Sequence, residues 1–390
     1  MKFALLYELQ RAPGDTDYHF KAVHEAIEQI CLADELGFDV VWTVEHHFLQ
    51  HFSGSPCPEV FYGALSQRTK RIRLGLGVVI LPYHHPVRVA ERVAMLDILS
   101  NGRVEFGTGR SGPYEQIGLG VDPRETRAMW DESLQAITQI WATEGEFSFQ
   151  GKYWQVPART VLPMPVQKPH PPIWVACLQP ETYQQAAEHG IGVLSFNANA
   201  PAPLEEHIKT YRQTVSQAPP VGAFTNNQWA NFTVAYCNED NRAARELGAQ
   251  AIREFFGPGR PYASASTSLF KDLLQQWGGE VPEHLRSAFR RFQEGGDLTG
   301  SAGQAAVQAI WEQLDADTLA DSGAIIAGDP ASCIKGIEQH EAVGADQMIM
   351  LMQNATVPHE QVMRSIELIG KQVIPHFRQK EALAQAAAAR

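Results

Sequence analysis

The sequence predicts an α/β fold, a (β/α)8 TIM barrel with insertions, from the alternation and the number of its apolar segments. Short β-type runs alternate with amphipathic helical patterns along most of the chain, an order typical of parallel βα units. About eight strands occur in this order, the number that closes a barrel. The 390 residues suffice for one large domain. A doubly wound open sheet is compatible with the same pattern.

Each expected strand is a short apolar run bounded by turn-forming or polar residues. The fourth follows a turn at Asn101-Gly102, a dipeptide typical of tight turns. We expect strands at 3–7, 38–44, 72–81, 104–108, 173–176, 193–196, 232–237 and 347–351.

The expected helices show apolar residues at three- and four-residue spacing. The first ends at Gly37, and the third opens at Pro86, because proline is favoured at the first helical position. His84-His85 precede this proline and are typical of a turn and helix cap more than of a metal site. We expect helices at 18–36, 58–68, 86–99, 124–141, 181–189, 204–217, 241–255 and 359–376.

Two segments do not fit the repeat and are expected to be insertions. Residues 147–172 are rich in proline and have the pattern of a β-hairpin, while residues 257–321 are longer than an ordinary βα loop. Long insertions in compact domains usually serve as lids or binding loops. We therefore expect one barrel domain over residues 1–380, a lid at about 257–321 and a disordered tail at 381–390.

The composition excludes some classes of binding partner and predicts the cellular compartment. The formal net charge of −12 disfavours nucleic acid and anionic membranes, which attract basic surfaces. The first apolar run is too short for a signal peptide, and no stretch approaches 18 apolar residues. We expect a cytoplasmic protein without membrane spans. An odd number of cysteines without Cys-x-x-Cys spacing suits a reducing compartment; they are Cys31, Cys57, Cys177, Cys237 and Cys333.

The first candidate site motif is Glu45-His46-His47-Phe48, directly after the second strand. Chemistry in a barrel occurs at the C-terminal ends of the strands, and a histidine there can act as an acid or base near neutral pH. A packed structural histidine or a metal pair is the alternative. Adjacent residues of a strand face opposite sides, so His46 and His47 cannot both point inward if the strand continues through them.

The second candidate is a group of glycines in the third and fourth strands. Gly75 and Gly77 lie inside the third, and Gly107 and Gly109 end the fourth, directly before Arg110. Glycine at such places permits close approach of a planar ring, and the arginine could hold a phosphate. A strand bend and a solvated surface arginine are the alternatives.

The third candidate is the turn at 175–182, where a strand ends and a helix opens with Pro180. Backbone N–H groups at a helix start can bind an anion. The alternative is an ordinary βα turn, since a barrel has eight. Cys177 has no basic neighbour in the sequence, so packing is its expected role.

Several strings together resemble the bacterial luciferase-like flavin-dependent monooxygenase family. Their order and spacing match the family from residue 1 to about 200, and again at 328–330 and 344–375, whereas 257–321 matches no segment of it. The strings are Asp-Glu-Leu-Gly-Phe-Asp at 34–39, Glu-His-His-Phe at 45–48, Leu-Pro at 81–82, His-Pro-Val-Arg at 85–88, Leu-Asp at 96–97, Leu-Ser-Asn-Gly-Arg at 99–103 and Phe-Gly-Thr-Gly-Arg at 106–110.

The resemblance implies that reduced FMN binds at the C-terminal mouth of the barrel. His46 then lies beside the flavin, and the end of the third strand packs on the isoalloxazine ring through a cis peptide at Gly77-Val78. Gly109 occupies the place of a reactive cysteine of luciferase, and the adjacent Arg110 contacts the phosphate.

The resemblance also places the turn after the fifth strand near the phosphate, with Ala176, Cys177, Leu178 and Gln179. The family usually has small hydroxyl residues there, so this sequence offers fewer side-chain donors. Weak retention of FMN would suit a protein that receives reduced flavin from a separate reductase. Ser195, at the end of the sixth strand, is expected to line the mouth.

The implied reaction uses reduced FMN and dioxygen, through a C4a-peroxyflavin, to oxygenate a small organic substrate. The family resemblance further implies a homodimer, formed by the helices after the second and third strands. One alternative is a flavin- or deazaflavin-dependent reductase on the same fold. Another is a non-catalytic flavin-binding protein, because a fold by itself does not fix chemistry.

Overall fold

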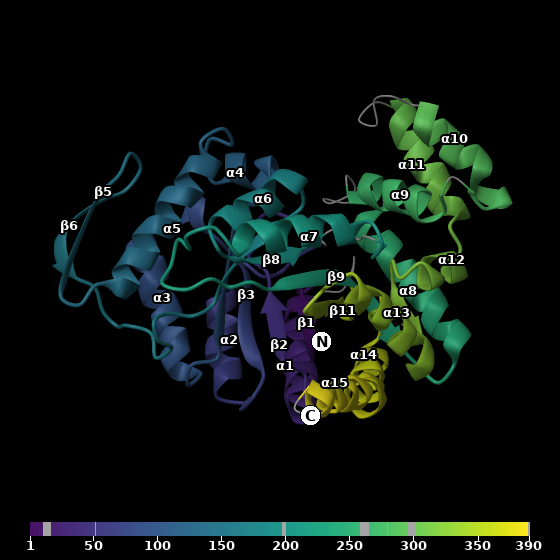
Figure 1. Cartoon of the computed structure of the whole chain (residues 1–390), viewed down its shortest axis with the longest axis horizontal. Helices are drawn as coiled ribbons and strands as arrows, with labels where there is room; N and C mark the ends of the chain where they lie inside the picture. Colours follow the sequence, from purple (N-terminus) through teal and green to yellow (C-terminus); the bar gives the residue numbers. More distant parts are fainter. Residues whose placement is uncertain are drawn as a thin grey trace.

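Eight parallel strands close into a barrel in the computed structural model (Figure 1), which describes residues 1–10, 17–50, 52–196, 200–257, 265–278, 280–294 and 301–388. Pairing of β11 with β1 and of β8 with β9 completes the ring. The barrel prediction is thus confirmed and the open sheet is wrong. Around the ring the strands are β1 (Lys2–Tyr7), β2 (Val40–Thr43), β3 (Arg73–Ile80), β4 (Val104–Gly109), β7 (Ile173–Cys177), β8 (Gly192–Ser195), β9 (Trp229–Cys237) and β11 (Gln347–Leu351).

Helices surround the barrel where the sequence pattern predicted them. Helix α1 ends at Gly37, whose φ of 88° suits glycine, and α3 begins at Pro86 with the His85 side chain accepting from the Val87 N–H, which confirms its capping role. Among the described residues, no helix is both long and apolar enough to cross a membrane. The helices are α1 (Tyr18–Leu36), α2 (Pro58–Ser66), α3 (Pro86–Leu99), α4 (Pro113–Gly118), α5 (Thr126–Ala142), α6 (Pro180–Glu188), α7 (Leu204–Val215), α8 (Asn241–Phe256) and α14 (His359–Leu368).

Among the elements that the sequence pattern did not predict are β10 (Ile326–Gly328), α13 (Pro330–Ala342) and the short helix α4. Strand β10 pairs in parallel with the C-terminal part of β9. Three residues are too few for a periodicity to be detected, and the strand exists because β9 offers it an unpaired edge. The expected hairpin at 147–172 is present as the antiparallel pair β5 (Glu146–Gln150) and β6 (Gln155–Thr160).

The described part of the insertion at 257–321 is helical, and its buried apolar side chains belong to the same core cluster as those of the barrel. Its helices are α9 (Ala265–Gln276), α10 (Arg286–Glu294), α11 (Ser301–Gln313) and α12 (Ala316–Asp321), grouped to one side of the barrel (Figure 1). The Phe270 ring lies 5.4 Å from Trp311 and 5.9 Å from Phe289, measured between centroids. Its role as a lid stays a prediction.

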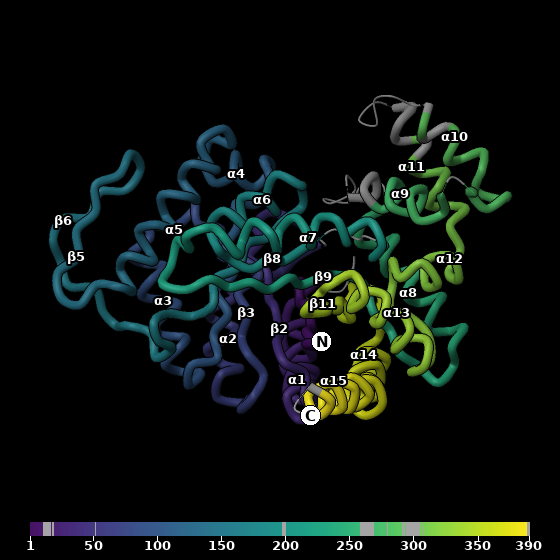
Figure 2. The backbone as a smooth tube through the Cα atoms, in the orientation of Figure 1, coloured from purple at the N-terminus to yellow at the C-terminus, as the bar shows by residue number. Residues whose placement is uncertain are grey.

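The C-terminus differs from the expected disorder. Helix α15 (Ile374–Ala388) runs through most of 381–390 and ends only at the edge of the described chain. The tail is rich in alanine, the residue with the highest helix propensity, and it extends an anchored helix without new nucleation. Arg378 anchors that helix through an ion pair with Asp39 at 2.6 Å, and both chain ends lie near α1 (Figure 2).

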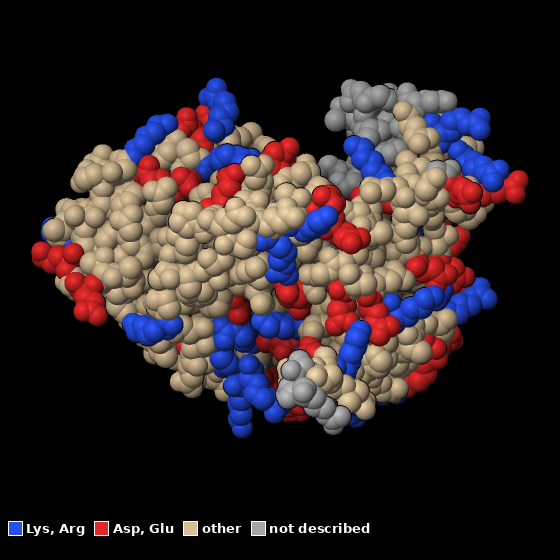
Figure 3. Space-filling view, viewed as in Figure 1, with Lys and Arg blue, Asp and Glu red and all other residues tan. Residues whose placement is uncertain are grey.

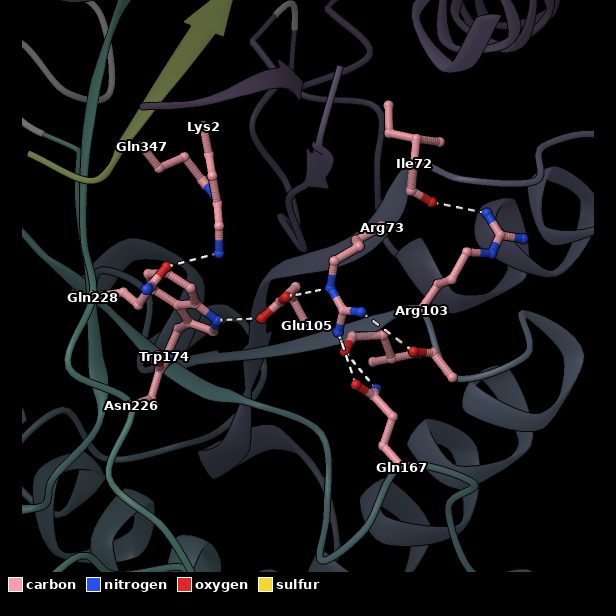
Figure 4. Close-up of polar contacts among 12 residues, drawn as sticks. Lys2, Ile72, Arg73, Arg103, Glu105, Gln167, Trp174, Asn226, Gln228 and Gln347 are labelled. Carbon is pink, nitrogen blue, oxygen red and sulfur yellow. Dashed lines mark hydrogen bonds and ion pairs between the residues drawn. The ribbon is translucent and has the colours of Figure 1, made fainter. Parts of the chain in front are cut away.

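The N-terminal end of the barrel is filled by polar and aromatic side chains. Trp42 and Trp174 contact edge-on, with centroids 5.5 Å apart, and the Trp174 indole N–H donates to Glu105 Oε2 at 2.7 Å. Arg73 forms an ion pair with the same Glu105 and donates to Gln167 Oε1 at 2.8 Å (Figure 4). Residues at this end of a TIM barrel usually stabilise the fold, and the active site lies at the C-terminal ends of the strands.

Candidate active site

A cavity of about 310 Å³ opens at the C-terminal ends of the strands. Successive strands contribute to its wall, and most of the lining is apolar. Of the predicted site residues, the cavity wall includes His46, Gly77, Val78, Gly109, Arg110, Ala176, Leu178 and Gln179. It also includes residues that sequence reasoning missed, among them Glu8, Thr182, Phe196, Phe232 and Phe255.

His46 is held at the cavity by the end of β2 and by helix α4. Its backbone N–H donates to the Ser55 carbonyl oxygen at 2.9 Å, and its Nδ1 lies 3.1 Å from both carboxylate oxygens of Glu115. Burial by itself favours the neutral imidazole, but the nearby carboxylates of Glu8 and Glu115 outweigh it and raise the pKa of His46. A protonated His46 is therefore favoured at higher pH than for a histidine in water.

Glu115 was missed because nothing in its local sequence points to a site. It is buried on α4, and it accepts from the His47 backbone N–H at 2.6 Å and from the Ser111 hydroxyl. Burial opposes its ionisation, but hydrogen bonds and the His46 charge lower the pKa of Glu115. An ionised Glu115 thus orients the His46 ring from its Nδ1 side.

Glu8 is the second carboxyl group that faces the cavity beside His46. It follows β1, is 2% exposed, and its Oε2 has no hydrogen-bond partner within the described chain. Burial raises the pKa of Glu8 to about 7, against the lowering effect of the His46 charge. A carboxyl that titrates near neutral pH in a cleft is typical of functional sites.

His47 points away from the cavity, as strand alternation predicted. Its Nε2 lies 3.3 Å from Glu45 Oε1, and His84 Nε2 lies 2.6 Å from the same oxygen. The Ile80 backbone N–H donates to the other Glu45 oxygen at 2.9 Å. Burial opposes ionisation of Glu45, yet these partners lower its pKa. This network ties β2 to β3, and no metal-ligand cluster of three such side chains occurs among the residues described.

The glycine strands form a smooth wall between these acid–base groups and Arg110. The Gly77–Val78 peptide bond is cis, as the resemblance implied. A Cβ at Gly109 would lie 2.5 Å from Val78 Cγ2, so only glycine permits this packing without a shift. The wall therefore presents backbone and one Val78 side chain to whatever binds against it.

Arg110 and the start of helix α6 form another part of the cavity wall. The Arg110 Nη1 lies 3.4 Å from Thr126 Oγ1, and no carboxylate pairs with its guanidinium within the described residues. Burial, together with the charge of Arg127, lowers the pKa of Arg110. Gln179 and Thr182 lie at the N-terminus of α6 and line the same space. An unpaired cation beside a helix N-terminus is suited to an anion such as phosphate.

Two predicted residues do not line the cavity. Cys177 is fully buried and Ser195 is bonded to the Tyr183 hydroxyl at 2.9 Å, on the helix side of their strands. Because side chains alternate along a strand, Phe196 faces inward where Ser195 does not, and Ala176 faces inward where Cys177 does not. The Thr182 hydroxyl, one turn into α6, supplies a donor that the expected turn lacks.

These residues fit FMN on structural grounds. The glycine wall leaves room for a flat ring, because Gly77 and Gly109 line the cavity without side chains, and a Cβ at Gly109 would displace Val78. Arg110, Thr182 and the N-terminus of α6 would hold the phosphate, the one charged group of the flavin side chain.

Comparison with known proteins agrees with this geometry. The luciferase-like monooxygenase family matches residues 1–347. The oxygenase component of a flavin-dependent trigonelline monooxygenase from Acinetobacter baylyi is 36% identical over 196 residues, which cover 50% of this chain and 53% of that protein. The chain thus spans about half the length of this relative. Limonene 1,2-monooxygenase from Rhodococcus erythropolis is 27% identical over 387 residues, covering 96% and 86% of the two chains.

A solved structure extends the similarity to the whole chain. The crystal structure of the monooxygenase RslO1 from Streptomyces bottropensis superposes with a TM-score of 0.73 and 27% identity, covering 97% of this chain and 100% of that one. The family match covers most of the chain, and the barrel and its C-terminal cavity accord with it. This protein belongs to the luciferase-like family of flavin-dependent monooxygenases.

Proposed function

We propose that this enzyme takes reduced FMN from a separate reductase and uses it with dioxygen to oxygenate a small organic substrate. The observation that carries the proposal is one cavity whose wall includes both acid–base groups and an arginine that no carboxylate pairs with among the described residues. His46 and Glu8 are the acid–base groups, and Arg110 is the arginine. The name of the trigonelline relative includes "oxygenase component", which supports the proposal that a separate protein acts as the reductase.

When bound, reduced FMN would supply the electrons that activate dioxygen. Arg110 and Thr182 would fix the phosphate, and the glycine wall would fix the plane of the ring. His46, oriented through Nδ1 by Glu115, would hold or deliver a proton at its Nε2. The apolar lining would exclude water, which limits unproductive side reactions in a closed site.

Oxygen consumption tests the proposal and separates it from the two alternatives. With photoreduced FMN and a substrate panel, we expect oxygen uptake coupled to an oxygenated product. A reductase would transfer a hydride to its substrate under anaerobic conditions and would not incorporate labelled oxygen from ¹⁸O₂. A flavin-binding protein without activity would bind FMN and change neither substrate nor the rate of flavin oxidation.

The surface supports a small-molecule substrate. On the face shown in Figure 3, Lys and Arg side chains are interspersed with Asp and Glu and form no broad basic field, which a nucleic-acid partner would require. The named relatives act on different compounds, so their names do not define the substrate of this enzyme. A cytoplasmic location is part of the proposal, since all five cysteines are unpaired.

We also propose a homodimer formed through α2 and α3. Large apolar side chains are exposed on these two helices, with Val60 at 69%, Met95 at 48% and Leu99 at 42%. Apolar side chains gathered on adjacent helices are typical of an interface between subunits. Light scattering would give a dimer mass, and Met95→Glu would reduce it to that of the monomer.

The insertion at 257–321 is proposed to cover the mouth of the cavity. It begins two residues after Phe255, which lines that cavity, so movement of the insertion would be transmitted directly to the wall. Hydrogen exchange should slow in α9 and α10 when FMN and substrate bind. Exchange unaffected by both ligands would argue against a lid.

A further inference from the structure

Glu8 lines the cavity, and one of its carboxyl oxygens, Oε2, is buried without a hydrogen-bond partner among the described residues. Its side chain is 2% exposed, and Oε2 accepts no hydrogen bond within the described chain. Its carbonyl oxygen accepts from Ser53 Oγ and the Gly54 N–H at 2.9 and 3.0 Å. The charge of His46 and a side-chain hydrogen bond from Ser53 partly stabilise the ionised carboxyl group. A buried carboxylate is costly unless a cation or donor meets it, and Oε2 is the oxygen at which a ligand could supply that partner.

His46 interacts electrostatically with Glu8, but its Nδ1 is directed to Glu115, 3.1 Å from each carboxylate oxygen. A single positive charge on His46 is therefore shared between two carboxyl groups, those of Glu8 and Glu115. When both carboxyl groups are ionised, one negative charge remains in excess on this side of the cavity.

Aromatic rings adjoin Glu8 and form one continuous wall. Phe52, one residue before Ser53, lies 4.9 Å from Phe255 between ring centroids. Phe255 lies 5.6 Å from Phe232, which lies 5.8 Å from Phe196. Phe196, Phe232 and Phe255 all line the cavity together with Glu8. We call these four phenylalanines the aromatic wall.

The barrel places this acidic, aromatic end away from the anion-binding end. Glu8 follows β1, and Arg110 follows β4, with β2 and β3 between them on the shorter path around the ring. Arg110 and α6 suit the phosphate, as argued above. The two ends of the cavity therefore have opposite charge preferences.

We propose that Glu8 and the aromatic wall select a substrate that carries a compact organic cation, such as a quaternary or protonated nitrogen. A carboxylate attracts the charge directly, and aromatic faces stabilise a cation from which water has been removed. An uncharged hydrocarbon would satisfy the wall but would leave Glu8 without a partner. This inference rests on the proposed function, because it treats the Glu8 end as the substrate end.

The test compares two probes of equal shape that differ in charge. Phenyltrimethylammonium carries a quaternary nitrogen where tert-butylbenzene has a carbon. Both would be titrated by calorimetry into the full chain saturated with oxidised FMN. We expect the cation to bind at least ten-fold more tightly than the neutral probe. Equal or tighter binding of tert-butylbenzene would overturn the proposal without any variant.

Variants then assign the preference to named side chains. Glu8→Gln keeps the size of the side chain but removes the charge, so the ten-fold preference should disappear. Phe255→Leu should weaken the cation several-fold and change the neutral probe little. Asp272→Asn is the matched control, because burial also raises the pKa of Asp272 to about 7 but it lies on α9, outside the cavity wall. An unchanged preference in Glu8→Gln would refute the role of Glu8.

Parallel measurements keep this inference separate from the proposed function. FMN affinity and FMN-dependent oxygen consumption would be recorded for the unmodified protein. Flavin chemistry without a cation preference would refute this inference alone. A cation preference in a protein that neither binds FMN nor consumes oxygen would refute the proposed function and, with it, the assignment of this end to the substrate.

Discussion

The Nδ1 atom of His46 lies 3.1 Å from both carboxylate oxygens of Glu115, a residue 69 positions later in the chain. Glu115 also accepts from the backbone N–H of His47 at 2.6 Å, so one carboxylate fixes both the ring and the loop that carries it. Because Glu115 holds the ring from its Nδ1 side, we expect His46 to transfer protons through Nε2.

Replacing His46 with alanine should reduce substrate oxygenation by about 10²–10⁴-fold, the usual contribution of a general acid–base group. The fold should remain, because the side chain borders a cavity. Hydrogen peroxide released per dioxygen consumed should rise. His47→Ala is the matched control: it removes a contact to Glu45 outside the cavity, so it should affect stability more than coupling. Normal coupling in His46→Ala would exclude His46 from the mechanism.

Glu115→Gln should shift the pH dependence of the reaction to lower pH. Burial lowers the pKa of His46, but the carboxylates raise it above its ordinary 6.5, and this variant removes one of them. Protonated His46 would then be lost at lower pH, and the basic limb of kcat/KM would move with it. NMR titration of the His46 ring provides an independent readout. If neither the basic limb of kcat/KM nor the pKa of the His46 ring changed, the result would contradict the contact between His46 and Glu115.

The His46–Glu115 pair also predicts a sign for stability. His46 has a raised pKa, so its contribution is complete below its unfolded value of 6.5 and is lost as pH rises through the folded pKa. Glu115 has a lowered pKa, so its contribution is present above 4.5 and is lost as pH falls through the folded pKa. In denaturant unfolding, Glu115→Gln should lower the free energy of unfolding most between these two limits, at about pH 5–6.

Glu8 predicts a pH dependence of stability opposite to that of Glu115, because its pKa is raised instead of lowered. Burial raises its pKa from 4.5 to about 7, so the folded state binds the proton more tightly than the unfolded state. Stability should fall as pH rises between those values, at about 1.4 kcal/mol per pH unit, to a total of about 3 kcal/mol. Glu8→Gln should therefore raise the free energy of unfolding at pH 8 and leave it nearly unchanged at pH 4. If the variant and the unmodified protein differed in free energy of unfolding by the same amount at pH 4 and pH 8, the buried charge would be excluded as the cause.

Arg110→Ala should weaken FMN binding by at least ten-fold and leave riboflavin binding unchanged. The reason is that riboflavin has the same ring but no phosphate, so it does not need the guanidinium. Thr182→Val should show the same selectivity with a smaller effect. Flavin fluorescence titration would measure the affinities of both variants and of the unmodified protein for FMN and for riboflavin. Equal losses for FMN and riboflavin would place Arg110 at the ring instead of the phosphate.

Alanine at Gly109 and at Gly107 should have different effects. A Cβ at Gly109 meets the Val78 side chain at 2.5 Å, which can shift at the expense of the cavity wall. A Cβ at Gly107 collides with the Leu76 carbonyl oxygen, which belongs to the barrel backbone. Gly109→Ala should therefore impair flavin affinity and cost about 1 kcal/mol. Gly107→Ala should cost about 3 kcal/mol or more and lower Tm.

Local sequence patterns predicted the elements of the barrel well because they depend on near neighbours. Alternation of βα segments placed all eight barrel strands, and proline and glycine marked helix ends at Pro86 and Gly37. Strand β10 escaped detection because three residues carry no period and its stability comes from pairing with β9. The tail was expected to be disordered, but its alanines continue helix α15 as far as Ala388.

The sequence by itself determined that His46 and Arg110 follow barrel strands, since motif and strand are adjacent in the chain. Only the tertiary structure decided which side chains meet. Glu8, His46 and Glu115 come from β1, β2 and α4, and closure of the ring brings their carboxylates around one imidazole. It also decided that Cys177 and Ser195 face outward, because the pleat turns every second side chain to the helices. Pairing across the sheet is long-range, so no local pattern encodes it.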